Sequence, residues 1–138
     1  MHELIAKRRI EFSDTDAGGV VHFSRYFIFM ETAEDEFLRS LGWGFTFEHE
    51  GRPGGWPKVD VSCEYLASAR YGEEIEVHLR VLEVTRSTIT YGFTLRRGET
   101  DLARGRTTSV CCAGKPGGGF ESIPIPGDLA RRIEPAPR

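Results

Sequence analysis

The longest periodic stretch of the chain is a run of apolar residues that recur every three or four positions from about His22 to Leu41. This spacing places them on one face of an α-helix. The residues of that face are Phe23, Tyr26, Phe27, Met30, Ala33, Phe37 and Leu41. Gly42 follows and is typical of a helix end, because glycine adopts the left-handed conformation at little cost. Since the face is rich in aromatic rings, we expect a broad surface such as a sheet to cover it.

Most of the remaining chain predicts strands. Apolar and polar residues alternate in two segments, with Val59, Val61, Cys63 and Tyr65 on one side of 57–66, and Ile75, Val77, Leu79 and Val81 on one side of 74–84. Strands are also expected over 3–12, 88–97 and 102–112. The connections at 69–72, 85–87 and 98–101 are short, which favours antiparallel neighbours.

Two segments are expected to lie outside this pattern. Residues 43–55 contain Gly44, Gly51, Pro53, Gly54 and Gly55, which predicts a mobile loop. The tail at 114–138 is rich in glycine and proline, with one helical turn expected at 128–133. The order of strand, long helix and further antiparallel strands indicates an α+β fold in which a curved sheet of about five strands wraps around one central helix. We expect a single domain over residues 1–138, with its core at about 3–113.

Composition narrows the possible functions. The chain has 138 residues and a net charge of −3, which argues against a surface made for nucleic acid. No apolar run reaches the ~20 residues of a membrane span, and the first residues lack a signal-peptide pattern, so we expect a cytoplasmic protein. The three cysteines and four histidines match no metal-ligand spacing, and we expect neither metal nor cofactor. The sequence also contains no Asn and no Gln, so an oxyanion donor has to be a backbone N–H, a hydroxyl, His or Arg.

The segment before the long helix has the most suggestive chemistry. It contains Asp14, Asp16, Gly18 and Gly19 and leads directly to the start of the predicted helix. A carboxylate beside a helix N-terminus can act as base or nucleophile, while free N–H groups stabilise an oxyanion. From the residues alone, an aspartate here is equally suited to capping a turn. Asp14 is interpreted as such a turn former.

This segment resembles the hot-dog-fold acyl-CoA thioesterases of the 4-hydroxybenzoyl-CoA thioesterase-like family. The resemblance rests on Asp14-Thr-Asp-Ala-Gly-Gly-Val-Val-His-Phe-Ser-Arg-Tyr26, on Glu31-Thr-Ala33 and Glu36-Phe-Leu-Arg39, and on the stretch from Tyr65 to Val77. It implies hydrolysis of acyl-CoA by a homodimer or homotetramer whose active sites lie at the dimer interface. It also implies that Asp16 is the catalytic carboxylate and that the Phe23 backbone N–H polarises the thioester carbonyl.

Further residues are candidates for the same site. His22 stands six positions after Asp16, where a related subgroup has a histidine at seven, so it is a candidate auxiliary group or simply a polar residue at the helix start. Gly19, Tyr26, Trp56, Val59 and Arg70 are candidate substrate-binding residues. Arg70, Arg86, Arg96 and Arg97 are candidates for the CoA phosphates, because guanidinium groups suit phosphate oxygens.

Several alternatives stay open at the level of sequence. Glu31 and Glu34 lie at or within the apolar stripe, which predicts either a paired charge or a second active-site carboxylate. Aromatic residues around the glycine-rich loop (Trp43, Phe45, Phe47 and Trp56) fit core packing and an acyl pocket equally well. Two other functions compete with hydrolysis: a hydratase or dehydratase that uses His22 with Glu31 or Glu34, and a non-catalytic acyl-CoA-binding module.

Overall fold

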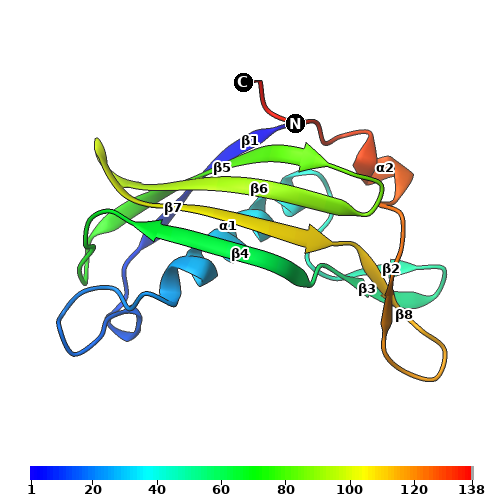
Figure 1. Ribbon diagram of the computed structural model, residues 1–138, viewed down its shortest axis with the longest axis horizontal. Coiled ribbons are helices and arrows are strands. Elements are labelled where there is room, and N and C mark those ends of the chain that lie inside the picture. Colours follow the sequence, from blue (N-terminus) through cyan, green and yellow to red (C-terminus); the bar gives the residue numbers. More distant parts are fainter. Residues whose placement is uncertain (138) are drawn as a thin grey trace.

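A long α-helix lies against one face of a curved antiparallel sheet (Figure 1). The structure is a computed structural model and describes residues 1–137. The strand order across the sheet is β1-β5-β6-β7-β4. The strands are β1 (Glu3–Arg9), β4 (Lys58–Tyr65), β5 (Glu74–Val84), β6 (Thr88–Arg97) and β7 (Thr100–Val110), and the helix is α1 (Arg25–Ser40). The expected α+β fold of five strands around one helix is confirmed.

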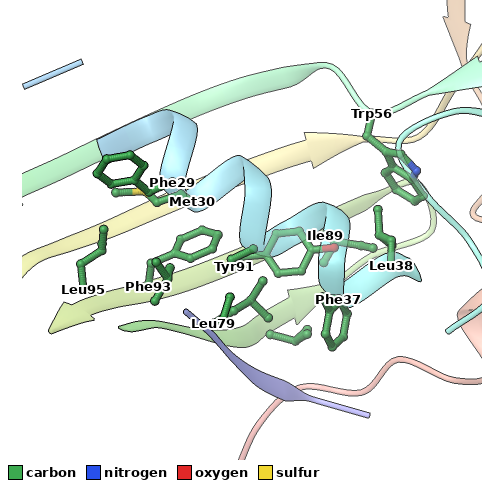
Figure 2. Close-up of a cluster of buried hydrophobic side chains, with 14 of the residues drawn as sticks. Phe29, Met30, Phe37, Leu38, Trp56, Leu79, Ile89, Tyr91, Phe93 and Leu95 are labelled. Atoms are coloured by element: carbon green, nitrogen blue, oxygen red, sulfur yellow. The ribbon is translucent and has the colours of Figure 1, made fainter. Parts of the chain in front are cut away.

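The hydrophobic core lies between α1 and the face of the sheet against which α1 packs. Figure 2 shows Phe29, Met30 and Phe37 of α1 among Leu79, Tyr91 and Phe93 of the sheet. The rings of Phe37 and Tyr91 meet edge-on, with centroids 5.9 Å apart. Burying one such side chain contributes about 2 kcal/mol. The apolar helix face and the alternating strands therefore stabilise each other.

The close approach of α1 to the sheet depends on a glycine in β7. A Cβ atom at Gly105 would lie 2.2 Å from the Cε atom of Met30, which is fully buried. Any side chain at position 105 would have to displace Met30 from a packed core. The glycine thus provides the space that the central helix needs.

The helix begins later than its periodicity predicts. Residues 22–24 lie outside α1, because the ring of His22 accepts a hydrogen bond from the Ser24 N–H, at 3.2 Å, and holds this segment in a turn. β1 likewise ends at Arg9 instead of reaching residue 12. A short 3-10 helix, η1 (Phe12–Asp14), follows it and is closed by reciprocal hydrogen bonds between Glu11 and Asp14.

The predicted loop at 43–55 is wrong, because most of it forms a hairpin. Its strands, β2 (Phe47–His49) and β3 (Arg52–Gly55), belong to a second sheet of order β2-β3-β8-β9. Gly54 makes the hairpin possible, since a Cβ there would lie 2.2 Å from the Phe47 ring. Phe47 in turn packs on Trp43 and Trp56, with centroids 5.5 and 6.0 Å away. The aromatic residues of this segment pack on the core.

One of the three expected hairpins is also wrong. β5, β6 and β7 are antiparallel neighbours as predicted, but β4 pairs with β7 and lies at the opposite side of the sheet from β5. The link at residues 66–73 therefore crosses the sheet instead of turning back on it. A short link predicts that β4 pairs with β5, but β4 pairs with β7, whose other neighbour is β6. Both positions would give β4 a partner for its backbone hydrogen bonds, so the alternation of its residues does not distinguish them.

The C-terminal segment adds to the core beyond residue 113. Its elements are β8 (Cys112–Gly114), β9 (Phe120–Ser122) and α2 (Gly127–Ala130). Four apolar residues of this segment are buried: Ile123, Ile125, Leu129 and Ile133. The expected strand at 102–112 is broken at Cys111, where β7 ends and β8 begins. Within residues 1–137, no helix is long and apolar enough to cross a bilayer.

Candidate active site

Asp14 anchors the turn that precedes α1. Its side chain is only 3% exposed, and its Oδ2 atom accepts a hydrogen bond from the Glu11 N–H at 2.8 Å. The guanidinium groups of Arg8 and Arg25 lie 3.7 and 3.8 Å from its Oδ1 atom. Its carbonyl oxygen accepts the His22 N–H at 2.8 Å. These contacts of the Asp14 carboxylate and carbonyl stabilise the fold, and the buried carboxylate is shielded from a substrate.

Asp16, two residues later, faces solvent. Its Oδ1 atom accepts the Gly18 N–H at 2.8 Å, and its carbonyl oxygen accepts the Gly19 N–H at 3.0 Å. Gly19 has a φ of +80°, which favours glycine at this position. No group within residues 1–137 bonds the Oδ2 atom of Asp16. The aspartate therefore forms the expected Asx turn and keeps one oxygen free.

The backbone between this turn and α1 leaves the Phe23 N–H without an acceptor among the described residues. Val21 donates to the Ala69 carbonyl at 2.8 Å, His22 donates to Asp14, and Arg25 donates to the His22 carbonyl at 2.9 Å. Ser24 donates to the His22 ring. Over the described residues, no acceptor is bonded to the N–H of Phe23, nor to that of Val20 directly after the turn. A free N–H beside a helix N-terminus can bind an oxygen that gains negative charge.

A pocket of 260 Å³ opens beside this N–H group. Its walls come from the pre-helical segment and from the end of β4, and they include Phe23, Tyr26, Tyr65 and Ser68. Tyr65 donates its hydroxyl hydrogen to the Phe23 carbonyl at 2.8 Å, and its ring meets Tyr26 edge-on at 5.2 Å. Desolvation, together with the neighbouring Cys63 and Tyr26, raises the pKa of Tyr65 to about 12. The Tyr65 hydroxyl therefore stays protonated and acts as a donor.

His22 supports the backbone through one ring nitrogen. Its Nδ1 atom accepts from the Ser24 N–H and lies 2.8 Å from the Ser24 hydroxyl oxygen. With Nδ1 as an acceptor, the neutral ring carries its proton on Nε2. The ring is half-buried and stacks on Phe23 with centroids 4.5 Å apart. His22 thus helps to shape the segment that presents the Phe23 N–H.

Arg70 and Gly19 lie next to each other at the rim of the turn. Val20 and Arg70 form an antiparallel bridge, and a Cβ atom on Gly19 would lie 3.9 Å from the Arg70 guanidinium. Arg70 is exposed. Two of the other candidate phosphate ligands are already paired, Arg96 with Asp101 at 2.8 Å and Arg97 with Glu73 at 3.1 Å.

Trp56 and Val59 lie at the other end of β4 from the candidate site in the same chain. Val59 and Tyr65 are six residues apart on one strand, a span of about 20 Å. Trp56 is buried and lies beside Leu38 near the C-terminal end of α1 (Figure 2). A single chain therefore does not bring Trp56 and Val59 to Asp16.

Glu34 is a paired buried carboxylate, one of the two alternatives that the sequence left open. It is fully buried; its Oε2 atom lies 2.5 Å from the Lys58 ammonium nitrogen and its Oε1 atom accepts the Ser109 hydroxyl at 2.7 Å. Burial raises the pKa of Glu34, and Lys58 and Ser109 oppose that rise. About two and a half turns of α1 separate Glu34 from Arg25, so Glu34 does not lie beside His22 within one chain.

Sequence reasoning missed Tyr65 as a site residue. It is one of four alternating residues of a predicted strand, and nothing in that pattern distinguishes it from Val59 or Val61. Its contact with Phe23 spans 42 positions and depends on β4 lying beside the N-terminal end of α1. Among residues 1–137, no cluster of three or more His, Cys, Asp or Glu side chains could hold a metal ion. The expected absence of metal and cofactor stays a prediction.

Known proteins are similar to this chain in sequence and in fold. A family model described as the thioesterase-like superfamily matches residues 10–133. A protein of Aquifex aeolicus is 36% identical over 105 residues, which cover 75% of this chain and 80% of that protein. The acyl-CoA thioesterase YbgC of Haemophilus influenzae is 32% identical over 104 residues, which cover 75% of this chain and 76% of that protein.

The likeness in structure extends over almost the whole chain. The 4-hydroxybenzoyl-CoA thioesterase of Pseudomonas sp. strain CBS-3 superimposes with a TM-score of 0.81 over 95% of this chain and 99% of that one. The two are 17% identical, so this likeness shows the fold alone. Together with the family match, it identifies the sheet wrapped around α1 as a hot-dog fold. The chain belongs to the thioesterase-like superfamily and is a hot-dog-fold thioester hydrolase.

Proposed function

We propose that the protein is an acyl-CoA thioesterase in which Asp16 supplies the catalytic carboxylate and the Phe23 N–H binds the carbonyl oxygen. The observation that carries the proposal is that the segment before α1 holds two groups without a partner among residues 1–137: the Oδ2 atom of Asp16 and the N–H of Phe23. CoA as the leaving group is supported by the relationship to YbgC of Haemophilus influenzae, which carries the name acyl-CoA thioesterase.

The reaction converts an acyl-CoA and water into a free acid and CoA. In one route Asp16 removes a proton from water as the water oxygen attacks the acyl carbon, and the C–S bond then breaks as the sulfur takes up a proton. In the other route Asp16 itself attacks, the thiolate leaves, and water hydrolyses the resulting anhydride. In both routes the acyl oxygen gains charge, and a preorganised N–H stabilises it.

The two routes differ in the source of the oxygen in the product. A single turnover in ¹⁸O-labelled water places ¹⁸O in the free acid when Asp16 acts as base. When Asp16 acts as nucleophile and water then attacks the Asp16 carboxyl carbon of the anhydride, the acid receives an unlabelled oxygen from Asp16 and the label enters the protein. Mass spectrometry of the acid and of the protein therefore identifies the nucleophilic route when the label enters Asp16.

We further propose that the active unit is a homodimer joined through β4, either alone or within a homotetramer. β4 is an edge of the sheet, and its apolar residues are exposed together with residues at the N-terminal part of α1. The exposed residues are Val59 (64%), Val61 (47%), Tyr65 (45%), Phe23 (64%) and Ile28 (39%). An unpaired edge with apolar side chains favours pairing with another strand. Antiparallel pairing of two β4 strands would bring Val59 of one chain toward the Tyr65 end of the other.

Two features support a reducing compartment such as the cytoplasm. Cys63, Cys111 and Cys112 are all free thiols. Burial raises the pKa of Cys111 to about 12, with the neighbouring Cys112 adding to the rise, so its thiol stays protonated. Unpaired cysteines are typical of proteins kept under reducing conditions.

A thiol-release assay with acetyl-, hexanoyl-, palmitoyl- and benzoyl-CoA tests the proposed activity. We expect at least one ester to be hydrolysed, and Asp16→Asn to lower kcat on that ester by about 10²–10⁴-fold. Asp128→Asn is the matched control, because Asp128 is an exposed aspartate on α2 that pairs with Arg131. Tight CoA binding without thiol release from any ester would instead favour a binding module.

A further inference from the structure

The Tyr65 hydroxyl has a structural partner in the candidate site but no place in the reaction described above. It donates to the Phe23 carbonyl at 2.8 Å, although Tyr65 belongs to β4 and Phe23 precedes α1. The Tyr65 ring is braced by Tyr26, which is buried and meets it edge-on. The hydroxyl is thus held in place by a rigid sheet and a packed ring.

This hydrogen bond acts on the peptide next to the proposed oxyanion donor. The peptide between Phe23 and Ser24 is fixed at both ends, by Tyr65 on its carbonyl and by the His22 ring on its N–H. The preceding peptide carries the Phe23 N–H, and its carbonyl accepts the Arg25 N–H. These bonds together restrict the backbone rotation at Phe23. Tyr65 is the contributor that comes from a different element.

We propose that Tyr65 is a positioning residue for thioester hydrolysis, whose hydroxyl holds the Phe23 backbone so that its N–H is aimed into the pocket. The inference rests on the proposed role of the Phe23 N–H. Preorganisation matters here because residues 16–19 and the Phe23 side chain are exposed in the single chain, so hydrogen bonds rather than side-chain packing hold the Phe23 peptide. An oxyanion donor stabilises the transition state only when it is already oriented.

The test compares Tyr65→Phe with the wild type on the ester that is hydrolysed fastest among acetyl-, hexanoyl-, palmitoyl- and benzoyl-CoA. The variant keeps the ring and its contact with Tyr26 and removes the hydroxyl that bonds the Phe23 carbonyl. We expect kcat to fall about tenfold, with KM changed by less than about twofold, because the donor acts mainly on the transition state. Tyr71→Phe is the control, since Tyr71 is 63% exposed and its ring meets Phe12 edge-on at 6.1 Å.

A second measurement reports on the hydrogen bond itself. The same ester, labelled with ¹³C at its carbonyl, is bound to Asp16→Asn and to the double variant Asp16→Asn with Tyr65→Phe, and isotope-edited infrared spectra are recorded. We expect the carbonyl band of the bound ester to lie below its frequency in water in the first protein, and to move back toward that frequency in the second. Thermal unfolding of each variant checks that both proteins are folded at the temperature of the experiment.

Three results would overturn the role of Tyr65: an unchanged kcat, a change in KM alone, or a carbonyl band that is the same with and without the hydroxyl. Failure of the proposed function is distinguishable from these. If Asp16→Asn turns over the ester at the wild-type rate, the assignment of Asp16 fails whatever Tyr65 does. If Asp16→Asn is inactive and Tyr65→Phe behaves as wild type, only the Tyr65 inference fails.

Discussion

At the scale of single residues, two aspartates that stand two positions apart have opposite surroundings. Asp14 is buried; its carboxylate accepts one backbone N–H and forms ion pairs with Arg8 and Arg25. Asp16 is exposed and accepts one N–H from its own turn. The same substitution should therefore affect the stability of the fold at one position and the chemistry at the other.

We predict that Asp14→Asn lowers the free energy of unfolding by about 2 kcal/mol, because a neutral amide replaces a buried charge that bonds charged and backbone donors. Asp16→Asn should leave the free energy of unfolding within about 1 kcal/mol of wild type, since asparagine forms the same kind of turn. Urea denaturation of both variants measures this difference. Equal losses at the two positions would show that Asp16 is also a structural residue.

The sequence predicts the residues of the turn better than their surroundings. The spacing of Asp16, Gly19 and Phe23 is local, and the structure places all three in the segment that leads to α1; their roles stay predictions. The contact of Tyr65 with Phe23 and the pairing of Glu34 with Lys58 are not local. They depend on which edge of the sheet β4 occupies, and the alternation of residues in a strand carries no information about its neighbour.

At the scale of elements, the pair of Glu34 and Lys58 connects α1 to β4. Because burial raises the pKa of Glu34 above its ordinary value of 4.5, the folded protein binds that proton more tightly than the unfolded chain does. The contribution of this group to stability therefore falls as pH rises from 4.5 through the pKa of the folded state. Lys58 limits the loss, because its charge lowers that pKa.

We predict that Lys58→Met destabilises the protein by about 3 kcal/mol near pH 7, because it leaves a buried carboxylate without its cation. The pKa of Glu34 should rise further, so the loss should shrink as the pH is lowered toward about 5 and Glu34 takes up a proton. Thermal unfolding across this pH range tests the prediction, with Lys7→Met as an exposed control on β1. A loss that does not depend on pH would contradict the assignment.

The sequence predicts helices and strands whose apolar residues recur at a regular spacing. It misses the hairpin of β2 and β3, which depends on a glycine. α1, β5 and β6 follow their patterns closely, because one face of each is buried against the core. The hairpin of β2 and β3 was predicted as a loop because its glycines suggested flexibility. In the structure Gly54 provides room for Phe47 and so permits pairing.

At the scale of the whole molecule, the two edges of the main sheet differ. β1 is the edge strand on one side of the sheet and β4 on the other. Each carries an exposed apolar residue, Ile5 on β1 and Val61 on β4. Only β4 also borders the pocket and the exposed residues at the start of α1. We therefore expect the dimer contact at β4, with consequences for activity as well as for assembly.

We predict that Val61→Lys shifts the protein toward monomers and lowers activity, because a charge at the centre of a paired edge opposes association. The matched substitution Ile5→Lys on β1 should leave both properties unchanged. Sedimentation velocity, with thiol release measured on the same samples, distinguishes the two edges. If Val61→Lys remains a dimer of full activity, the interface does not lie at β4.

The most direct test of the central claim is a single turnover of the fastest-hydrolysed acyl-CoA by an excess of Asp16→Asn, followed by thiol release. The account predicts a folded protein that binds the ester but cleaves it about 10²–10⁴-fold more slowly than the wild type, while Asp128→Asn cleaves it at the wild-type rate. A folded Asp16→Asn that cleaves the ester as fast as the wild type would contradict the assignment of Asp16 as the catalytic carboxylate.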